Sequence, residues 1–224
     1  MEREVKLNDK MKALEQLGKH LGMFTEKVEL DADMDLNITI DYGGGRFRMN
    51  INVQMNPGFK EVDRSRKRYI VMKGSAGSGK SVDTAQNYIL RLMQDPGRNL
   101  LCVRKADVTN RDSTFAELQG AIFRMFGEQY KKYWHINSSN MIVECKINRN
   151  QIIFRGVNDE KQREKLKSIT FKRGKLTDVW IEEATEITQA DFEIIDDRLR
   201  GELPDGQFYQ IRIDVQPGIG VPLD

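Results

Sequence analysis

The spacing of apolar residues changes along the chain and predicts different elements in different parts. Residues 3–21 carry apolar side chains at steps of three and four, which predicts an amphipathic helix. Residues 36–42 and 49–55 alternate apolar and polar side chains, as strands with one buried face do, and they flank three consecutive glycines at 43–45. From residue 68 onward, short apolar runs alternate with segments of helical spacing.

This second part predicts a mainly parallel sheet flanked by helices. The predicted strands lie at 69–73, 99–104, 176–182 and within 207–215, and the predicted helices at 80–93, 113–127, 159–167 and 188–200. Two further apolar runs within 141–156 surround a turn at Asn148 to Asn150, which predicts a hairpin. Strands and helices in alternation are typical of an α/β fold.

Composition limits the size and the setting of this fold. A chain of 224 residues with 39% hydrophobic residues suits one α/β domain and a small appendage. Because no apolar run reaches the roughly 20 residues of a membrane-spanning helix, we expect no membrane partner. Cys102 and Cys145 lie inside strand-like patterns, and we expect both to be reduced core residues in a cytoplasmic setting. The 36 basic and 34 acidic residues nearly balance, so net charge does not indicate a nucleic-acid partner.

A glycine-rich turn between the strand at 69–73 and the helix at 80–93 carries the spacing of a phosphate-binding loop, or P-loop. Small residues there let successive backbone N–H groups surround phosphate oxygens at a helix N-terminus. We predict that Lys80 reaches the β- and γ-phosphates and that Ser81 binds Mg²⁺. The predicted nucleotide-binding residues are Gly74, Ser75, Ala76, Gly77, Ser78, Gly79, Lys80 and Ser81.

Two acidic residues, Glu182 and Glu183, follow the apolar run at 176–181. The carboxyl edge of an open parallel sheet is where ligands bind. Downstream of a P-loop, the pair predicts that Glu182 contacts Mg²⁺ and that Glu183 is the base that orients and activates water. Glu182 is longer than the aspartate usual at this position, which leaves direct and water-mediated contact with the metal as alternatives.

Phosphoryl transfer also needs positive charge, and an arginine finger contributes ~10³ to 10⁵ in rate. The predicted P-loop contains no arginine, so the candidates are Arg104 and Arg111, near the end of the strand at 99–104. Arg155 and Arg200 are further options. A surface ion pair is the competing role for each of the four.

Five stretches of the sequence together resemble the ATPase domain of the large subunit of tailed-phage terminases, the motor that drives DNA into the capsid. They are YIVMKGSAGSGKS, LLCVRKADVTNRDSTFAEL, QIIFRGVNDEKQREKLKSI, DVWIEEATEIT and DDRLRG. The resemblance covers about residues 49–215 and implies a P-loop ATPase that hydrolyses ATP with Mg²⁺ and moves double-stranded DNA. It also implies a terminase small subunit and a portal or procapsid as partners in the host cell cytoplasm. We expect a homo-oligomeric ring when assembled, with a monomer in isolation as the alternative.

Two departures from the family pattern limit these expectations. Large subunits continue into a nuclease domain, whereas this sequence ends at Asp224, so we expect no DNA cleavage from this chain. The segment after the last strand reads DVQPG where relatives often read TFNP. Gln216 is therefore only a candidate for relaying hydrolysis to movement.

The N-terminal stretch KMKALEQLGKHLGMFTEKVEL resembles the C-terminal part of a phage terminase small subunit, and Met49 resembles the start of a large subunit. This favours three parts: a small-subunit-like segment (1–42), a glycine-rich join of natural or engineered origin (43–48) and the ATPase domain (49–224). The alternative is a β-hairpin around the glycines, in which Ile40 pairs with Ile51 or Val53.

Three functions fit the motifs. The first is a motor ATPase that couples hydrolysis to translocation of double-stranded DNA. The second is a nucleotide-binding assembly or adaptor module with little turnover outside the assembled ring, because a neighbouring subunit supplies the finger arginine. A helicase-type ATPase is the third.

Overall fold

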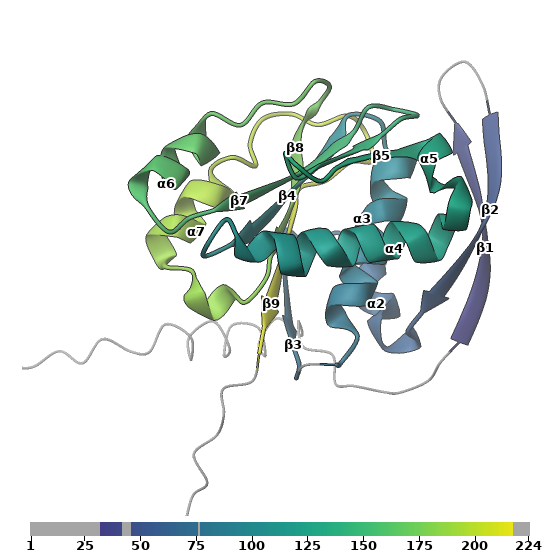
Figure 1. The fold of residues 1–224 in the computed structure, drawn as a ribbon, viewed down its shortest axis with the longest axis horizontal. Helices are drawn as coiled ribbons and strands as arrows, with labels where there is room; N and C mark the ends of the chain where they lie inside the picture. Colours follow the sequence, from purple (N-terminus) through teal and green to yellow (C-terminus); the bar gives the residue numbers. More distant parts are fainter. Residues whose placement is uncertain (1–31, 42–45, 76, 217–224) are drawn as a thin grey trace, which may run out of the picture.

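A computed structural model of the chain describes residues 32–41, 46–75 and 77–216. Its centre is a seven-stranded sheet (Figure 1) with the strand order β3-β9-β8-β4-β7-β6-β5. Neighbouring strands run parallel from β3 to β7, and β6 and β5 add an antiparallel edge, which confirms the predicted mainly parallel sheet. The strands are β3 (Tyr69–Lys73), β4 (Arg98–Arg104), β5 (Trp134–Asn137), β6 (Ile142–Cys145), β7 (Gln151–Gly156), β8 (Lys175–Ile181) and β9 (Gln210–Val215).

Helices cover both faces of this sheet (Figure 1). Helices α3 (Lys80–Gln94) and α4 (Ala116–Phe126) lie on one face, and α6 (Glu160–Lys167) and α7 (Gln189–Asp196) lie on the other. The short elements are η1 (Pro57–Phe59), α2 (Lys60–Arg64), η2 (Arg111–Phe115), η3 (Gly127–Gln129), α5 (Tyr130–Tyr133) and η4 (Ala184–Glu186). Within the described ranges, no helix combines the length and the apolar character that crossing a membrane requires.

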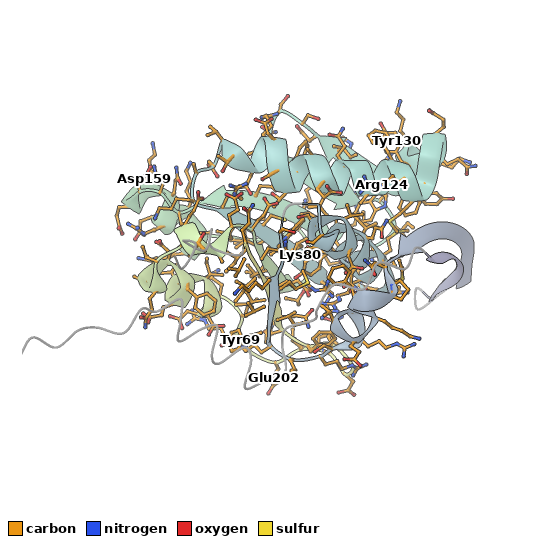
Figure 2. All side chains as sticks on the ribbon, turned by 90° about the horizontal axis from the view of Figure 1, so that it is seen from below. Tyr69, Lys80, Arg124, Tyr130, Asp159 and Glu202 are labelled. Atoms are coloured by element: carbon orange, nitrogen blue, oxygen red, sulfur yellow. The ribbon has the colours of Figure 1, made fainter. Side chains whose placement is uncertain are left out.

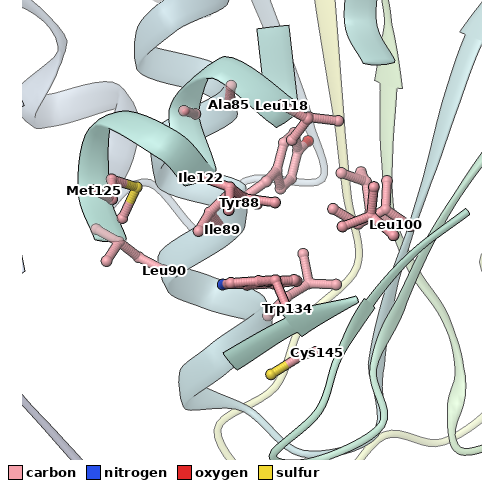
Figure 3. Packing of buried hydrophobic residues seen from close by; sticks show 14 of the residues in the cluster. Ala85, Tyr88, Ile89, Leu90, Leu100, Leu118, Ile122, Met125, Trp134 and Cys145 are labelled. Atoms are coloured by element: carbon pink, nitrogen blue, oxygen red, sulfur yellow. The ribbon is translucent and has the colours of Figure 1, made fainter. Parts of the chain in front are cut away.

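Strand alternation divides the interior into two cores. On β4, Leu100 and Cys102 pack toward α3 and α4, whereas Leu101 and Val103 pack toward α6 and α7. Figure 3 shows the first core, where side chains of α3 and α4 meet and Trp134 of β5 closes one end. Cys102 and Cys145 are free and buried, as predicted. Both cores fix the strands whose carboxyl ends carry the candidate motifs.

Local signals predicted some helix ends correctly and others wrongly. The start of α7 carries a capping box, since the side chains of Thr188 and Asp191 each accept from the other residue's backbone N–H. The helix predicted at 113–127 instead begins as a π-helical turn, in which the Ser113 hydroxyl donates to Thr109 O at 2.8 Å. Strand β5 was missed because only four residues form it.

The two alternating stretches that flank the N-terminal glycines form a pair of antiparallel strands. Strand β1 (Ala32–Asp41) pairs antiparallel with β2 (Arg46–Met55), and Ile40 is opposite Phe47 rather than Ile51 or Val53. Residues 46–48 belong to β2, so the proposed join at 43–48 overlaps the start of that strand, and the division into three parts stays a prediction. The predicted helix at 3–21 and the turn at 42–45 lie outside the described residues. The buried Ile51 and Val53 join the α3–α4 core.

Candidate active site

The predicted motifs meet at the carboxyl edge of the parallel strands. The P-loop follows β3, Arg104 ends β4, and Glu182 directly follows β8. Figure 2 views the molecule from this side and labels Lys80 at the start of α3. Parallel strands all end at the same edge, so residues far apart in the sequence become neighbours there.

The P-loop backbone adopts a conformation that depends on its glycines. Gly77 and Gly79 have φ values of 77° and 81°, which L side chains rarely adopt. A Cβ on Gly74 would lie 2.9 Å from the Ser78 hydroxyl, and the Gly74 N–H donates to Val215 O of β9 at 3.2 Å. The loop is therefore tied to the neighbouring strand as well as to β3. Ala76 lies outside the described residues.

Lys80 lies inside the curve of this loop. Its ammonium donates to Gly74 O at 2.6 Å, to Ser75 O at 3.3 Å and to the Ser78 hydroxyl at 3.1 Å. All three acceptors are neutral. Burial lowers the pKa of Lys80 below its usual value, and the charges of Asp214 and Glu182 partly offset this effect. The charge of Lys80 is thus available for a ligand.

The two acids are held by one arginine. Arg104 Nη1 lies 3.2 Å from Glu182 Oε2, and Arg104 Nη2 bonds Glu183 Oε2. The same Nη2 lies 4.0 Å from the more exposed Glu186. Glu183 has φ 51° and ψ 52°, a left-handed conformation that costs a glutamate of order 1 kcal/mol and is concentrated at functional sites. This backbone conformation turns the chain directly after β8.

The other candidate residues differ in how close they come to the acids. The Gln216 amide lies 3.4 Å from Glu183 Oε1, so the end of β9 reaches the same place. Arg111 is exposed and instead donates to Ser138 O at 2.9 Å, between β5 and β6. Arg155 donates to the backbone oxygen of Phe154, and Arg200 is exposed after α7. Among the four arginine candidates, Arg104 is the one that contacts the acids within the described residues.

The available oxygen ligands suit Mg²⁺ bound together with phosphates. Ser81 lies in the first turn of α3, and Glu182 supplies a carboxylate from β8. In the part of the chain that the structure describes, no cluster of three or more histidine, cysteine or acidic side chains could hold a metal by itself. Mg²⁺ needs only one or two protein oxygens when phosphates and waters complete its shell, so this donor set fits.

Sequence reasoning missed a buried carboxylate beside the P-loop. Asp214 of β9 is opposite Met72 in the β3–β9 pairing, and Trp180 Nε1 of β8 donates to its Oδ2 at 3.0 Å. Its Oδ1 has no hydrogen-bond partner among the described residues. A signal was present: polar Gln210, Arg212 and Asp214 alternate with Ile211 and Ile213 in a strand that is buried on both faces.

Comparisons with known proteins extend these observations. A family model described as phage terminase large subunit matches residues 66–218, more than half of the chain. A search of curated proteins found no match. The match begins at residue 66, so the likeness of residues 1–42 to a small subunit remains a prediction.

Solved structures share the fold at low sequence identity. The large terminase of a thermophilic bacteriophage matches with TM-score 0.50 and 16% identity, over 66% of this chain and 34% of that one. The same protein in complex with ADP matches with TM-score 0.50 and 13% identity, over 67% and 33%. The HK97 bacteriophage large terminase matches with TM-score 0.51 and 9% identity, over 74% and 34%. This chain thus spans about a third of the length of these relatives.

Proposed function

The chain belongs to the phage terminase large subunit family, and from this premise we propose that it hydrolyses Mg-ATP to drive double-stranded DNA into a procapsid. The observation that carries the proposal is the convergence of the P-loop, the acidic pair and Arg104 at one edge of the sheet. The large terminase of the thermophilic bacteriophage has been solved with ADP, which supports a nucleotide as the ligand of this loop.

The P-loop holds the phosphates. Backbone N–H groups between Gly74 and Ser81 surround the phosphate oxygens, and the N-terminus of α3 adds its dipole. Lys80 exchanges its three neutral acceptors for the β- and γ-phosphates. Ser81 and Glu182 would hold Mg²⁺, which would neutralise charge on the phosphates.

Glu183 orients the attacking water and accepts its proton. Arg104, which contacts both acids, holds them in place before the nucleotide binds and prevents Glu182 and Glu183 from repelling each other. When a nucleotide occupies the loop, the Arg104 guanidinium would turn from the acids to the transferring phosphoryl group and act as a finger within the same chain. Gln216, next to Glu183, relays the state of the site to β9.

The test separates binding from turnover in three variants. Lys80→Ala should lose nucleotide binding, whereas Glu183→Gln should retain binding and lose about a hundredfold or more in kcat, because the amide cannot accept the proton. Glu186→Gln is the matched control, because Glu186 is exposed and 4.0 Å from Arg104. It should keep turnover within about twofold. Wild-type turnover in Glu183→Gln would refute the role of the base.

One observation favours a second candidate, an assembly module that turns over slowly alone. Arg104 contacts the acids, and Arg111 donates to Ser138 O in another loop, so a neighbouring subunit would supply the finger in a ring. The ATPase rate per chain should then rise steeply with protein concentration. With Arg111 as the finger that the neighbour supplies, Arg111→Ala should abolish this rise and leave the rate of the isolated chain unchanged. A rate independent of concentration supports a complete site in one chain. Strand separation of a duplex would instead indicate a helicase-type enzyme.

The remaining partners follow from the same proposal. They are double-stranded DNA, a portal or procapsid and a terminase small subunit, in the host cell cytoplasm. We also retain the division into a small-subunit-like segment before residue 43 and the ATPase domain from Met49. Comparing DNA-stimulated ATP turnover of the full chain with that of a chain starting at Met49 tests whether the N-terminal segment contributes.

A further inference from the structure

Asp214 differs from the other buried carboxylates of the sheet in its partners. Asp178 of β8 bonds Arg91 at 2.9 Å and Arg98 at 2.9 Å, so two arginines balance its charge. Asp214 is 4% exposed and accepts one hydrogen bond, from the neutral indole of Trp180. A buried carboxylate without a bonded cation is costly, and a neutral side chain of the same shape would avoid that cost.

The position of Asp214 connects it to the P-loop. The next residue on β9, Val215, accepts the Gly74 N–H, and Asp214 itself is opposite Met72, two residues before the loop. Burial raises the pKa of Asp214 to about 7, while the Trp180 hydrogen bond and then the charge of Lys80 oppose this rise. Conversely, burial lowers the pKa of Lys80, and the negative charge of Asp214 opposes this change. The two side chains are therefore electrostatic neighbours.

We propose that Asp214 is a positioning residue that acts through Lys80, as an internal counter-charge that competes with the nucleotide phosphates for the ammonium. Lys80 otherwise bonds neutral oxygens in the loop, and the negative charges that act on it are Asp214 and Glu182, of which Asp214 is the one buried in the sheet. Above its raised pKa, Asp214 places a negative charge behind the anion site, which weakens nucleotide binding and speeds release of the product nucleotide. The inference rests on the nucleotide site proposed above and adds a residue that sets its affinity.

The direct test is Asp214→Asn, which removes the charge but keeps the shape and an oxygen that can accept from Trp180. ATP and ADP affinities are measured by calorimetry on the full chain at pH 8, without Mg²⁺, so that the metal does not contribute. We expect roughly threefold to tenfold tighter binding of both nucleotides and slower ADP release, from the Coulomb interaction of nearby charges in a partly buried site. Unchanged or weaker binding overturns the inference.

Asp178→Asn is the matched control, because it makes the same change in a buried residue of the neighbouring strand. It should lower Tm, since Arg91 and Arg98 lose their partner, but leave nucleotide affinity unchanged. Equal tightening in both variants would mean that any loss of buried charge has this effect, and it would overturn the specific role of Asp214. Absence of nucleotide binding by the wild-type chain would refute the proposed function together with the inference.

A spectroscopic readout covers the case in which Asp214→Asn does not fold. The sequence has two tryptophans, Trp134 and Trp180, so a Trp134→Phe chain reports on Trp180 alone. Because the Trp180 indole donates to Asp214, adding ATP should change its emission as the phosphates and the rearranged Lys80 alter the electric field at the carboxylate. Constant emission at saturating ATP would contradict the link between Asp214 and the loop.

Discussion

The two faces of the central sheet are built from the same strands but carry different chemistry. On β9, Ile211 and Ile213 face the apolar core under α7, whereas Arg212 and Asp214 face α3. On β8, Val179 and Ile181 belong to the apolar core, and Asp178 bonds Arg91 of α3. We call these the apolar face and the charged face.

The charged face leads to the P-loop. Arg212 bonds Asp63 of α2 at 3.0 Å and Asn87 of α3 at 2.9 Å, and its guanidinium lies 5.4 Å from the Tyr88 ring centroid. The network thus connects the segment before β3 with the helix that begins at Lys80. On β8 and β9, this protein therefore places its buried charges on the face that α3 covers, next to the apolar core of α3 and α4, whereas the same strands present aliphatic side chains to α7.

The largest expected effect comes from Arg212→Met on the charged face. Burial and the nearby charge of Asp63 raise the pKa of Asp83 to about 8, so at neutral pH Asp63 is the main negative charge facing Arg212. Removing the guanidinium leaves that charge buried and unpaired, which should cost about 3–5 kcal/mol of unfolding free energy. Urea unfolding measures the loss. The double variant Asp63→Leu/Arg212→Met should recover part of it, and no recovery would mean that the pair does not carry the cost.

The matched change on the apolar face is Ile211→Ala, one residue earlier on the same strand. Ile211 is fully buried, and its truncation should cost about 2–4 kcal/mol through lost burial and the cavity left behind. Combining it with Arg212→Met should give additive losses, because the faces pack against different helices. Non-additive losses in the double variant would show that the two faces are energetically coupled.

The next prediction concerns stability at low pH and the side chain of Asp191, which connects α7 to neighbouring segments. Arg163 bonds it at 2.7 Å, Lys105 at 3.4 Å and the Thr188 hydroxyl at 2.7 Å. Although burial opposes the shift, these bonds lower its pKa from 3.8 to about 2. The stabilisation, up to about 2 kcal/mol, is complete above the unfolded pKa near 4 and is lost as pH falls through about 2. In a profile of Tm from pH 7 to pH 2, Asp191→Asn should abolish the part of the Tm decrease that protonation of Asp191 causes.

The smallest effect should come from an exposed pair on α6. Lys167 lies 2.6 Å from Glu164, but both side chains are more than half exposed. Lys167→Ala should change the unfolding free energy by less than about 0.5 kcal/mol, because solvent screens such pairs. A loss above about 1 kcal/mol would show that distance alone, rather than burial, ranks the ion pairs of this protein.

Local pattern predicted much of this fold but little of the charged face. The strand at 69–73, the hairpin within 141–156 and the caps of α6 and α7 were all predictable, because each depends on residues close in sequence. The short strand β5 and the π-helical start before α4 were not, because neither has a strong local signal. The partners of Arg212 lie 149 and 125 residues away, beyond the reach of any local rule.

The sequence by itself determined the alternation of strands and helices, the P-loop spacing and the acidic pair, because backbone conformation and phosphate binding depend on residue types at short, fixed separations. Only the tertiary structure decided which charges meet. It brought Arg104 rather than Arg111 to Glu182 and Glu183, and it placed Asp214 beside the P-loop with one neutral hydrogen-bond donor. The order β3-β9-β8-β4 produced these neighbours, since strand order sets which carboxyl ends lie side by side.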